Sequence, residues 1–480
     1  MNGREGVLAG RRVLVVSRRD VRHPRAGGPE RYLHEVARRW AAGGVRVTWA
    51  VTRPPGSAER EVIDGVEVVR SATPLELCPP GAVRLLRRGG RFDAVVNATG
   101  SGLALVLPLI TGLRTPVVQV VHRARPGVEG VRFARSAPVG RLLAGPVARW
   151  GGSDRAVVAL SPAARHELRR HTGFRGPIFV VPPGAPTTVD TGERAADPTI
   201  VALAALVPEQ RLDLLLDALA AVVERVPRLR VEIIGDGPEL PRLSRIAHDA
   251  GIGSAVTFHG RLPDVERQAW LRRAWLAVST AVDEVCGCST LEAAAHGVPC
   301  VALDAAGVRD FVRDGRTGWV VDSPDGLAAE LARRLAAAAD VEHARHASER
   351  CREWADRFQW DRSARLLAGV VEHQVHAARR RPQRRYARSD LSTIVRLPRG
   401  TAVPAGAIRV TDEVAEADGV VSVLLNGCDE VDAHAVLDRL EVTEATVRLA
   451  RHIDLLVGPP TASWTTRRGP ESRTSAHERG

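Results

Sequence analysis

The chain has 480 residues, of which 44% are hydrophobic and 4% aromatic, and its formal net charge is +12. This length exceeds that of one ordinary hydrophobic core and predicts two or three domains. The sequence contains no run of 18 or more apolar residues, and the apolar stretch near its start is too short for a signal peptide, so we expect a cytoplasmic protein.

All 68 basic residues are arginine, and they are unevenly distributed. Residues 1–190 hold 30 Arg against 14 acidic residues, giving +16, whereas residues 191–480 hold 38 against 42, giving −4. No nucleic-acid-binding module accompanies the basic charge, so we expect no nucleic acid. The charge does fit peripheral association with the inner face of a membrane. Residues 82–92, AVRLLRRGGRF, resemble a short interfacial helix, although a solvated basic helix face is the alternative.

The six cysteines are scattered, which argues against a disulfide framework and for reduced thiols. Cys286 and Cys288 form a C-x-C pair, but no second pair of cysteines or histidines stands at ligand spacing. We therefore expect no metal site.

Short β-branched runs alternate with longer helical stretches through most of the chain. The predicted strands are residues 11–17, 45–52, 65–70, 93–98, 116–122, 156–161 and 178–182, then 199–206, 229–237, 255–260, 274–280 and 299–304. This alternation predicts an α/β fold with two doubly wound, Rossmann-like domains, residues 1–188 and 189–376. Ligands of such sheets bind beyond the carboxyl ends of the strands, so we expect the site in the cleft between the domains.

The remainder of the chain is organised differently. The sequence predicts helices in residues 325–379. It also predicts a basic linker at residues 377–390 and a disordered tail at residues 461–480. Residues 391–460 predict a small α/β appendage of unknown role, with strands at 419–427 and 453–458 and helices at 429–440 and 443–452.

The stretch VDEVCGCSTLEAAAHGVPC, residues 282–300, carries two carboxylates, Glu284 and Glu292. In a purely structural interpretation, Ser289 and Glu292 form a capping box, and Gly297 with Pro299 ends the helix. In a functional interpretation, the loop at Gly287 and the helix start bind a diphosphate, while the two carboxylates accept hydrogen bonds from sugar and ribose hydroxyls.

Several fragments around these carboxylates resemble one family when taken in order. They are AGGPERYLHEVARRWAAGGVRVTWAVT at 26–52, VVHR at 120–123, VVPPGA at 180–185, RVEIIGDGPELPRL at 230–243, VTFHGRLPD at 256–264 and the E-x7-E pair. Over residues 11–375 the chain resembles the retaining GT-B glycosyltransferases of family 4.

The resemblance implies a reaction and a set of site residues. The reaction is transfer of a hexose from a UDP- or GDP-sugar to an acceptor hydroxyl with retention of configuration, without a metal or other cofactor. The acceptor would be a polysaccharide, a lipid-linked sugar or a small molecule, bound on the side of the N-terminal domain. His122 and Glu284 are implied to be catalytic. The implied donor-binding residues are Gly27, Gly28, Arg211, Gly235, Gly287, Cys288 and Glu292.

The chain departs from the family at the donor diphosphate. Where the family has an arginine and a lysine, this chain has Ala205 and Gln210, and Arg211 stands one place later. Loss of such cations weakens catalysis. Two hypotheses therefore stand: a working glycosyltransferase in which Arg211 replaces the cations, or a catalytically weakened GT-B protein that serves as a sugar-nucleotide-binding or regulatory subunit.

Overall fold

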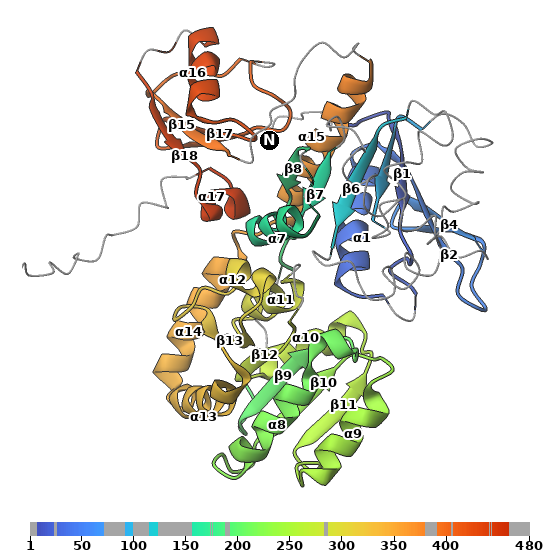
Figure 1. Ribbon diagram of the computed structural model, residues 1–480, viewed down its shortest axis with the longest axis vertical. Coiled ribbons are helices and arrows are strands. Elements are labelled where there is room, and N and C mark those ends of the chain that lie inside the picture. The colour runs from blue at the N-terminus through green and yellow to red at the C-terminus, as the bar shows by residue number, and fades with distance from the viewer. Residues whose placement is uncertain are drawn as a thin grey trace, which may run out of the picture. The chain divides into compact units, whose positions relative to one another are not determined.

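The computed structural model describes residues 7–23, 26–71, 92–98, 115–122, 156–172, 174, 176–187, 193–282, 287–379, 391–404, 407–440, 442 and 444–459 (Figure 1). The chain divides into two compact units, Met1–Arg388 and Ser389–Gly480. The interfacial segment at 82–91, the predicted catalytic Glu284, residues 380–390 of the linker and the predicted tail lie outside the described residues.

Within the described part of the first unit, the N-terminal sheet runs in the order β3-β4-β2-β1-β5-β6-β7-β8. All neighbours are parallel except β3 and β4. The strands are β1 (Arg12–Val16), β2 (Arg46–Thr52), β3 (Arg60–Ile63), β4 (Val66–Ser71), β5 (Ala94–Asn97), β6 (Val117–Val121), β7 (Val157–Ala159) and β8 (Ile178–Val180). The central strands are continuous apolar runs because helices cover both faces of a parallel sheet.

Helices α1 (Gly28–Ala42) and α7 (Pro162–Thr172) belong to this sheet, and the long helix α15 (Trp360–Arg379) packs against α1. The Trp40 indole donates a hydrogen bond to the Ala364 carbonyl at 2.9 Å, and Tyr32 contacts Trp360 edge to face. The last helix of the unit therefore returns to the N-terminal domain.

The second sheet of this unit is parallel throughout, in the order β11-β10-β9-β12-β13-β14. Its strands are β9 (Thr199–Leu203), β10 (Arg230–Ile234), β11 (Val256–Gly260), β12 (Leu276–Ser279), β13 (Cys300–Leu303) and β14 (Gly318–Val321). Its helices are α8 (Leu212–Val223), α9 (Leu240–Asp249), α10 (Asp264–Arg273), α11 (Cys288–Ala295), α12 (Ala306–Phe311), α13 (Leu327–Ala338) and α14 (Val341–Ala355), with 3-10 turns η2 (Pro208–Gln210) and η3 (Pro324–Gly326). All twelve predicted strands of the two domains are confirmed, whereas β3 and β14 were not predicted.

The second unit contains an antiparallel sheet in the order β16-β17-β15-β18. Its elements are β15 (Thr393–Leu397), β16 (Glu413–Ala417), β17 (Val420–Leu425), α16 (Glu430–Arg439), β18 (Thr446–Leu449) and α17 (His452–Val457). The predicted strand at 419–427 and helix at 429–440 are confirmed.

Two predictions in this unit are wrong. The segment predicted as a helix at 443–452 contains strand β18, because its four consecutive residues Thr446–Leu449 pair with β15. The predicted strand at 453–458 is helix α17, because the Asp454 carboxylate accepts from the Arg451 backbone N–H at 2.8 Å and caps a helical turn. Such short apolar runs fit either structure when only their periodicity is considered.

None of the helices in the described ranges combines the length and the apolar character that a membrane crossing requires.

Candidate active site

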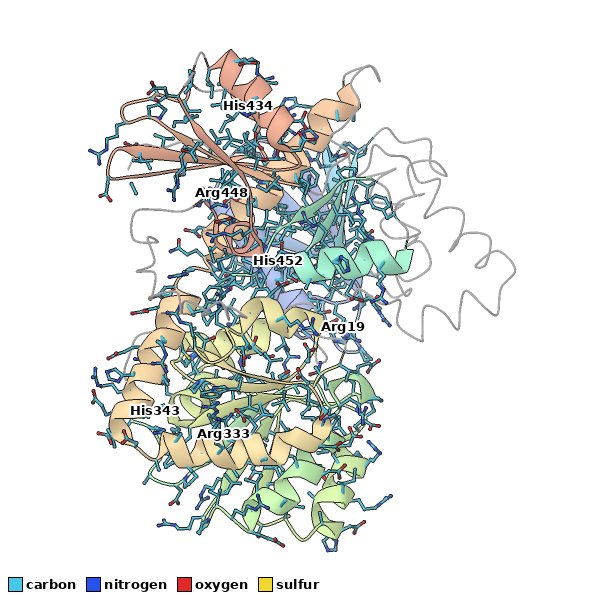
Figure 2. All side chains as sticks on the ribbon, turned by 60° about the vertical axis from the view of Figure 1, so that its left-hand side comes forward. Arg19, Arg333, His343, His434, Arg448 and His452 are labelled. Atoms are coloured by element: carbon cyan, nitrogen blue, oxygen red, sulfur yellow. The ribbon has the colours of Figure 1, made fainter. Side chains whose placement is uncertain are left out.

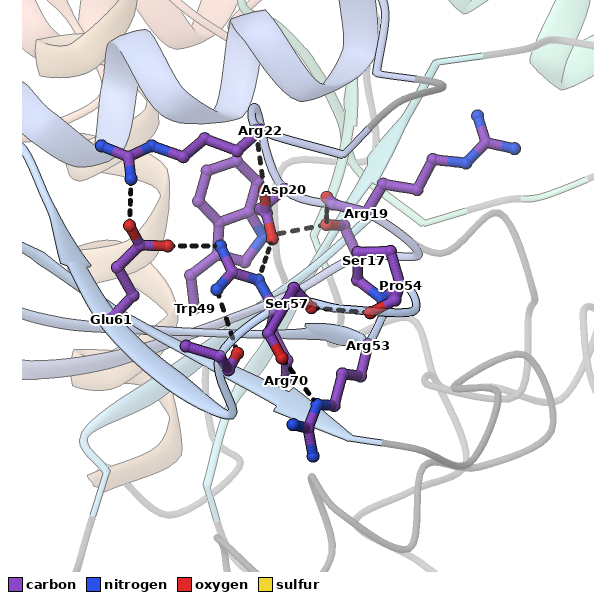
Figure 3. A network of polar contacts seen from close by, with 11 residues as sticks. Ser17, Arg19, Asp20, Arg22, Trp49, Arg53, Pro54, Ser57, Glu61 and Arg70 are labelled. Atoms are coloured by element: carbon purple, nitrogen blue, oxygen red, sulfur yellow. Dashed lines mark hydrogen bonds and ion pairs between the residues drawn. The ribbon is translucent and has the colours of Figure 1, made fainter.

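The loop between β1 and α1 is fixed by a buried polar network (Figure 3). The guanidinium of Arg70 donates to Asp20 at 2.7 Å and to Glu61 at 2.8 Å, and the side chains of Arg70 and Asp20 are only 2% and 1% exposed. The Trp49 indole donates to the Ser17 hydroxyl at 2.8 Å. These bonds hold the chain where it leaves the carboxyl end of β1 and approaches the glycine pair.

Gly27 and Gly28 stand at the start of α1, at the end of this loop. The Glu30 carboxylate accepts from the Gly27 backbone N–H at 2.8 Å. Burial raises the pKa of Glu30. A Cβ at Gly27 would meet no atom closer than 3.9 Å, and the backbone there is extended. Folding therefore does not require glycine at position 27.

His122 follows β6, at the carboxyl edge of the same sheet. Its ring meets Tyr32 of α1 edge to face, with 5.5 Å between centroids. Both ring nitrogens are buried, although part of the residue is accessible, and neither has a hydrogen-bond partner among the described residues. Burial lowers the pKa of His122 to about 4, so the imidazole is neutral at pH 7. Unpaired buried polar atoms are uncommon, so the two ring nitrogens of His122 are candidates to hydrogen-bond a ligand.

Glu292, on α11, is held between two arginines from different elements. Its Oε2 accepts from Arg31 Nη1 of α1 at 2.7 Å, and its Oε1 accepts from Arg267 Nε of α10 at 2.9 Å. The residue is 6% exposed. Burial alone would raise the pKa of Glu292, but the two ion pairs outweigh burial and lower it. Glu292 is therefore a carboxylate at neutral pH.

The predicted capping box at Ser289 is wrong. Helix α11 begins at Cys288, its N-cap is Gly287, and no side chain caps it. Glu292 is thus free to turn toward the arginines instead of the helix start. The predicted end of the helix is confirmed, because α11 stops at Ala295 and Gly297 adopts φ +76°.

Gly287 and Cys288 form the start of α11. Gly287 has φ +56°, and a Cβ there would lie 2.1 Å from the Phe311 ring, so close packing as well as backbone conformation requires glycine. Cys288 packs against the core of the N-terminal domain. It is disulfide-bonded, so the expectation of reduced thiols is wrong at this position.

Gly235 and Gly237, just after β10, are required by close packing against the loop that follows β9. A Cβ at Gly235 would lie 1.9 Å from the Ala204 carbonyl oxygen, and one at Gly237 would lie 2.2 Å from the Leu206 carbonyl oxygen. The two glycines let the loop after β10 approach the loop after β9.

The positions that lack the expected cations lie on that loop after β9. The Gln210 carbonyl accepts from the Thr280 hydroxyl at 2.9 Å. Arg211, with φ +47°, points its guanidinium to Asp213, with Nε–Oδ1 at 3.1 Å. The only arginine near these positions in sequence is thus paired with an acidic neighbour.

Helix α1 links four of the predicted site residues, Gly27, Gly28, His122 and Glu292. It begins at the Gly27–Gly28 pair, and its consecutive residues Arg31 and Tyr32 contact Glu292 and His122. Sequence reasoning missed Arg31 and Arg267, because nothing in the spacing of either arginine singles it out from the other 66. In the part of the chain that the structure describes, no three His, Cys, Asp or Glu side chains gather closely enough to hold a metal ion.

Solved structures define the class of the fold. Sucrose-phosphate synthase from Thermosynechococcus elongatus aligns with a TM-score of 0.63 at 22% identity, covering 77% of this chain and 100% of that chain. Anabaena HepE in complex with UDP and glucose aligns with a TM-score of 0.58 at 19% identity, covering 76% and 100%. The fold is GT-B, with two Rossmann-like domains, as the sequence predicts.

Sequence comparisons then give the family. The model for Glycosyltransferase Family 4 matches residues 26–189, and that for Glycosyl transferases group 1 matches residues 188–354. The chain is 31% identical to the GDP-mannose-dependent alpha-(1-6)-phosphatidylinositol monomannoside mannosyltransferase of Mycolicibacterium smegmatis, over 65% of this chain and 87% of that protein. It is 28% identical to the D-inositol 3-phosphate glycosyltransferase of Streptomyces avermitilis, over 74% and 85%. The chain belongs to the group 1 glycosyltransferases with the GT-B fold and is a transferase.

Proposed function

We propose that this glycosyltransferase moves a hexose from a GDP- or UDP-sugar to an acceptor hydroxyl with retention of anomeric configuration. One observation carries the proposal: a single helix, α1, links the glycine pair, His122 and Glu292. A donor lying across the start of α1 would therefore meet a hydrogen-bonding imidazole and a carboxylate at once. The GDP-mannose-dependent mycobacterial relatives make GDP-mannose the first donor to test.

In this reaction the acceptor hydroxyl oxygen bonds to the anomeric carbon, and the bond from that carbon to the diphosphate oxygen breaks. The nucleoside diphosphate leaves with the bonding electron pair, and its freed oxygen takes up the proton that the acceptor hydroxyl loses. The neutral His122 imidazole can donate one hydrogen bond to a sugar hydroxyl and accept another. Glu292 would accept from the ribose hydroxyls, and Glu284, by resemblance, from the donor sugar. We propose no metal, because protein groups and helix starts can stabilise the leaving diphosphate.

Donor binding tests this proposal without knowledge of the acceptor. Titration calorimetry should show GDP or UDP binding to the purified chain, and Glu292→Gln should weaken binding about tenfold, since a carboxylate accepts hydroxyl hydrogen bonds more strongly than an amide. Glu266→Gln is the matched control, because Glu266 is exposed on α10 and should leave binding unchanged. Absence of binding to either nucleotide and to their sugar derivatives would contradict the proposal.

A second candidate function is a sugar-nucleotide-binding protein with weakened catalysis. Two observations favour it: Arg211 is paired with Asp213, and both oxygens of Glu292 are occupied by arginines. Turnover separates the candidates. Nucleotide binding without release of nucleoside diphosphate from any sugar nucleotide would select the binding protein, whereas steady release would select the enzyme.

A further inference from the structure

The second unit has a cavity of about 280 Å³, and none of the residues assigned above lines it. It is lined by Ile394, Arg396, Thr446, Arg448, Leu449 and Arg451. The strand register explains this set: Arg396 stands opposite Thr446, and Ile394 stands opposite Arg448, on neighbouring strands β15 and β18. These four side chains therefore share one face of the sheet, while Val395 and Val447 face the core on the other side.

The cavity is basic, whereas the unit around it is acidic. Residues 391–459 contain 6 Arg and 11 Asp or Glu, and three of the six arginines line this one cavity. Asp454 is the acidic side chain beneath them. Three guanidinium charges against one carboxylate give the site a net charge of about +2.

One arginine of the cavity is preorganised. Arg448, on β18 (Figure 2), donates from Nη1 and Nη2 to the two oxygens of Asp454 at 2.7 and 3.1 Å. The Asp454 side chain is only 5% exposed, so it holds the guanidinium plane in place. Arg451 reaches the same carboxylate at 3.6 Å. Of the five N–H donors of Arg448, two bind Asp454 and a third donates to the Leu449 carbonyl at 3.0 Å, so two remain for a ligand.

Arg396 supplies the cation available to a ligand. Its side chain is exposed on β15, and no carboxylate pairs with it among the described residues. The cavity floor is apolar, because Ile394 is fully buried, and Leu449 is 43% exposed at its rim. The site thus combines anion-binding groups with a small apolar surface.

We propose that the second unit binds a phosphate monoester in this cavity. A phosphate monoester is close to a dianion at neutral pH, which matches the net charge, and its oxygens suit guanidinium donors. The volume lies just below the roughly 300–1,000 Å³ of ordinary ligand pockets, so it fits a phosphoryl group with a short organic substituent rather than a whole sugar nucleotide. The phosphate can be carried by a soluble metabolite or by a lipid headgroup.

The test uses the full chain with Arg396→Gln and a matched control, Arg399→Gln. Both arginines are exposed in the same unit, but only Arg396 lines the cavity. We expect calorimetry to show glycerol 3-phosphate binding, weakened about tenfold by Arg396→Gln and unchanged by Arg399→Gln, because a hydrogen bond to a charged group is lost. Binding of GDP or UDP should be the same in all three proteins, which separates this site from the proposed donor site.

Vesicles containing phosphatidic acid give the lipid arm of the experiment. Sedimentation with these vesicles, reduced by Arg396→Gln alone, would support the site with a lipid as its ligand, even if glycerol 3-phosphate does not bind. If the arginines only protect the edge strand β18 from pairing, neither ligand will distinguish the two variants. That result, or binding of neither ligand by the unmodified chain, would overturn the proposal.

Discussion

At the scale of single residues, His122 has the most unusual surroundings of the predicted site residues. Its neighbours bury both ring nitrogens without pairing them, and its pKa falls to about 4. Because the pKa of His122 is lower in the folded chain than in the unfolded chain, the unfolded chain binds this proton first as the pH falls. The contribution of His122 to folding stability is therefore complete above about pH 6.5 and is lost as the pH falls toward 4.

We predict that the ring protons of His122 do not titrate between pH 5.5 and 8. Proton NMR spectra of the unmodified chain and of His122→Gln would identify its signals by difference. A chemical-shift change with a midpoint near pH 6.5 would contradict burial of an unpaired neutral imidazole. Addition of a bound sugar nucleotide should move the same signals, since the ligand would supply the missing hydrogen-bond partners.

At the scale of elements, the sequence predicted the positions of strands better than the roles of the loop residues between them. Continuous apolar runs such as RVLVV at β1 leave little choice, because only a strand buried on both faces suits them. By contrast, the T-V-R-L of β18 was predicted as helix, because its partner strand β15 is more than 45 residues away in sequence. Register partners at such distances are invisible in a local pattern.

The glycines of the site illustrate the same limit. The sequence presents Gly27 and Gly235 alike as candidate donor contacts, whereas the structure separates them. At Gly235 an added Cβ would lie 1.9 Å from a backbone oxygen, while at Gly27 it would meet nothing closer than 3.9 Å. Only the packed loops can show which glycine the fold needs.

We predict opposite effects of alanine at these two glycines. Gly235→Ala should lower the free energy of unfolding by about 3 kcal/mol, because the loop must move to admit the methyl group. Gly27→Ala should leave stability nearly unchanged but weaken nucleotide binding, if the diphosphate lies over this backbone. Chemical denaturation and calorimetry on both variants make the comparison. If Gly27→Ala lowers the free energy of unfolding as much as Gly235→Ala does, the fold requires glycine at position 27 and the prediction is wrong.

At the scale of the whole first unit, the Arg31–Glu292 ion pair joins the two Rossmann-like domains. The sequence predicted Glu292 as a ligand contact. It could not reveal that Arg31, 261 residues earlier in the chain, donates to this carboxylate at 2.7 Å. If Glu292 binds the donor ribose, as we propose, the ribose hydroxyls would compete with Arg31 for its carboxylate. Binding of a donor at Glu292 would then require the pair to loosen.

We predict that Arg31→Gln favours a more open arrangement of the two domains. The pair should contribute about 1–2 kcal/mol, since Glu292 is buried but Arg31 is partly exposed. Small-angle X-ray scattering should show a larger radius of gyration for the variant. Arg38→Gln is the control, because Arg38 on the same helix pairs only with Glu35 among the described residues.

The pH dependence of this arrangement has a definite sign. The ion pairs hold the pKa of Glu292 below its ordinary value of about 4.3, so the pair is intact above that pH. Its contribution is lost as the pH falls through the lowered value. The two domains of the unmodified chain should therefore open only in acid, and the radius of gyration should not change between pH 6 and 8.

Sugar transfer by the purified chain tests the proposed reaction most directly. The purified chain is incubated with GDP-mannose, UDP-glucose and related donors, release of nucleoside diphosphate is followed, and the anomeric configuration of any product is read by NMR. We predict release from at least one donor, a product with the donor's configuration, and loss of both with Glu284→Ala. An inverted product, or turnover that survives Glu284→Ala and Glu292→Gln unchanged, would contradict it.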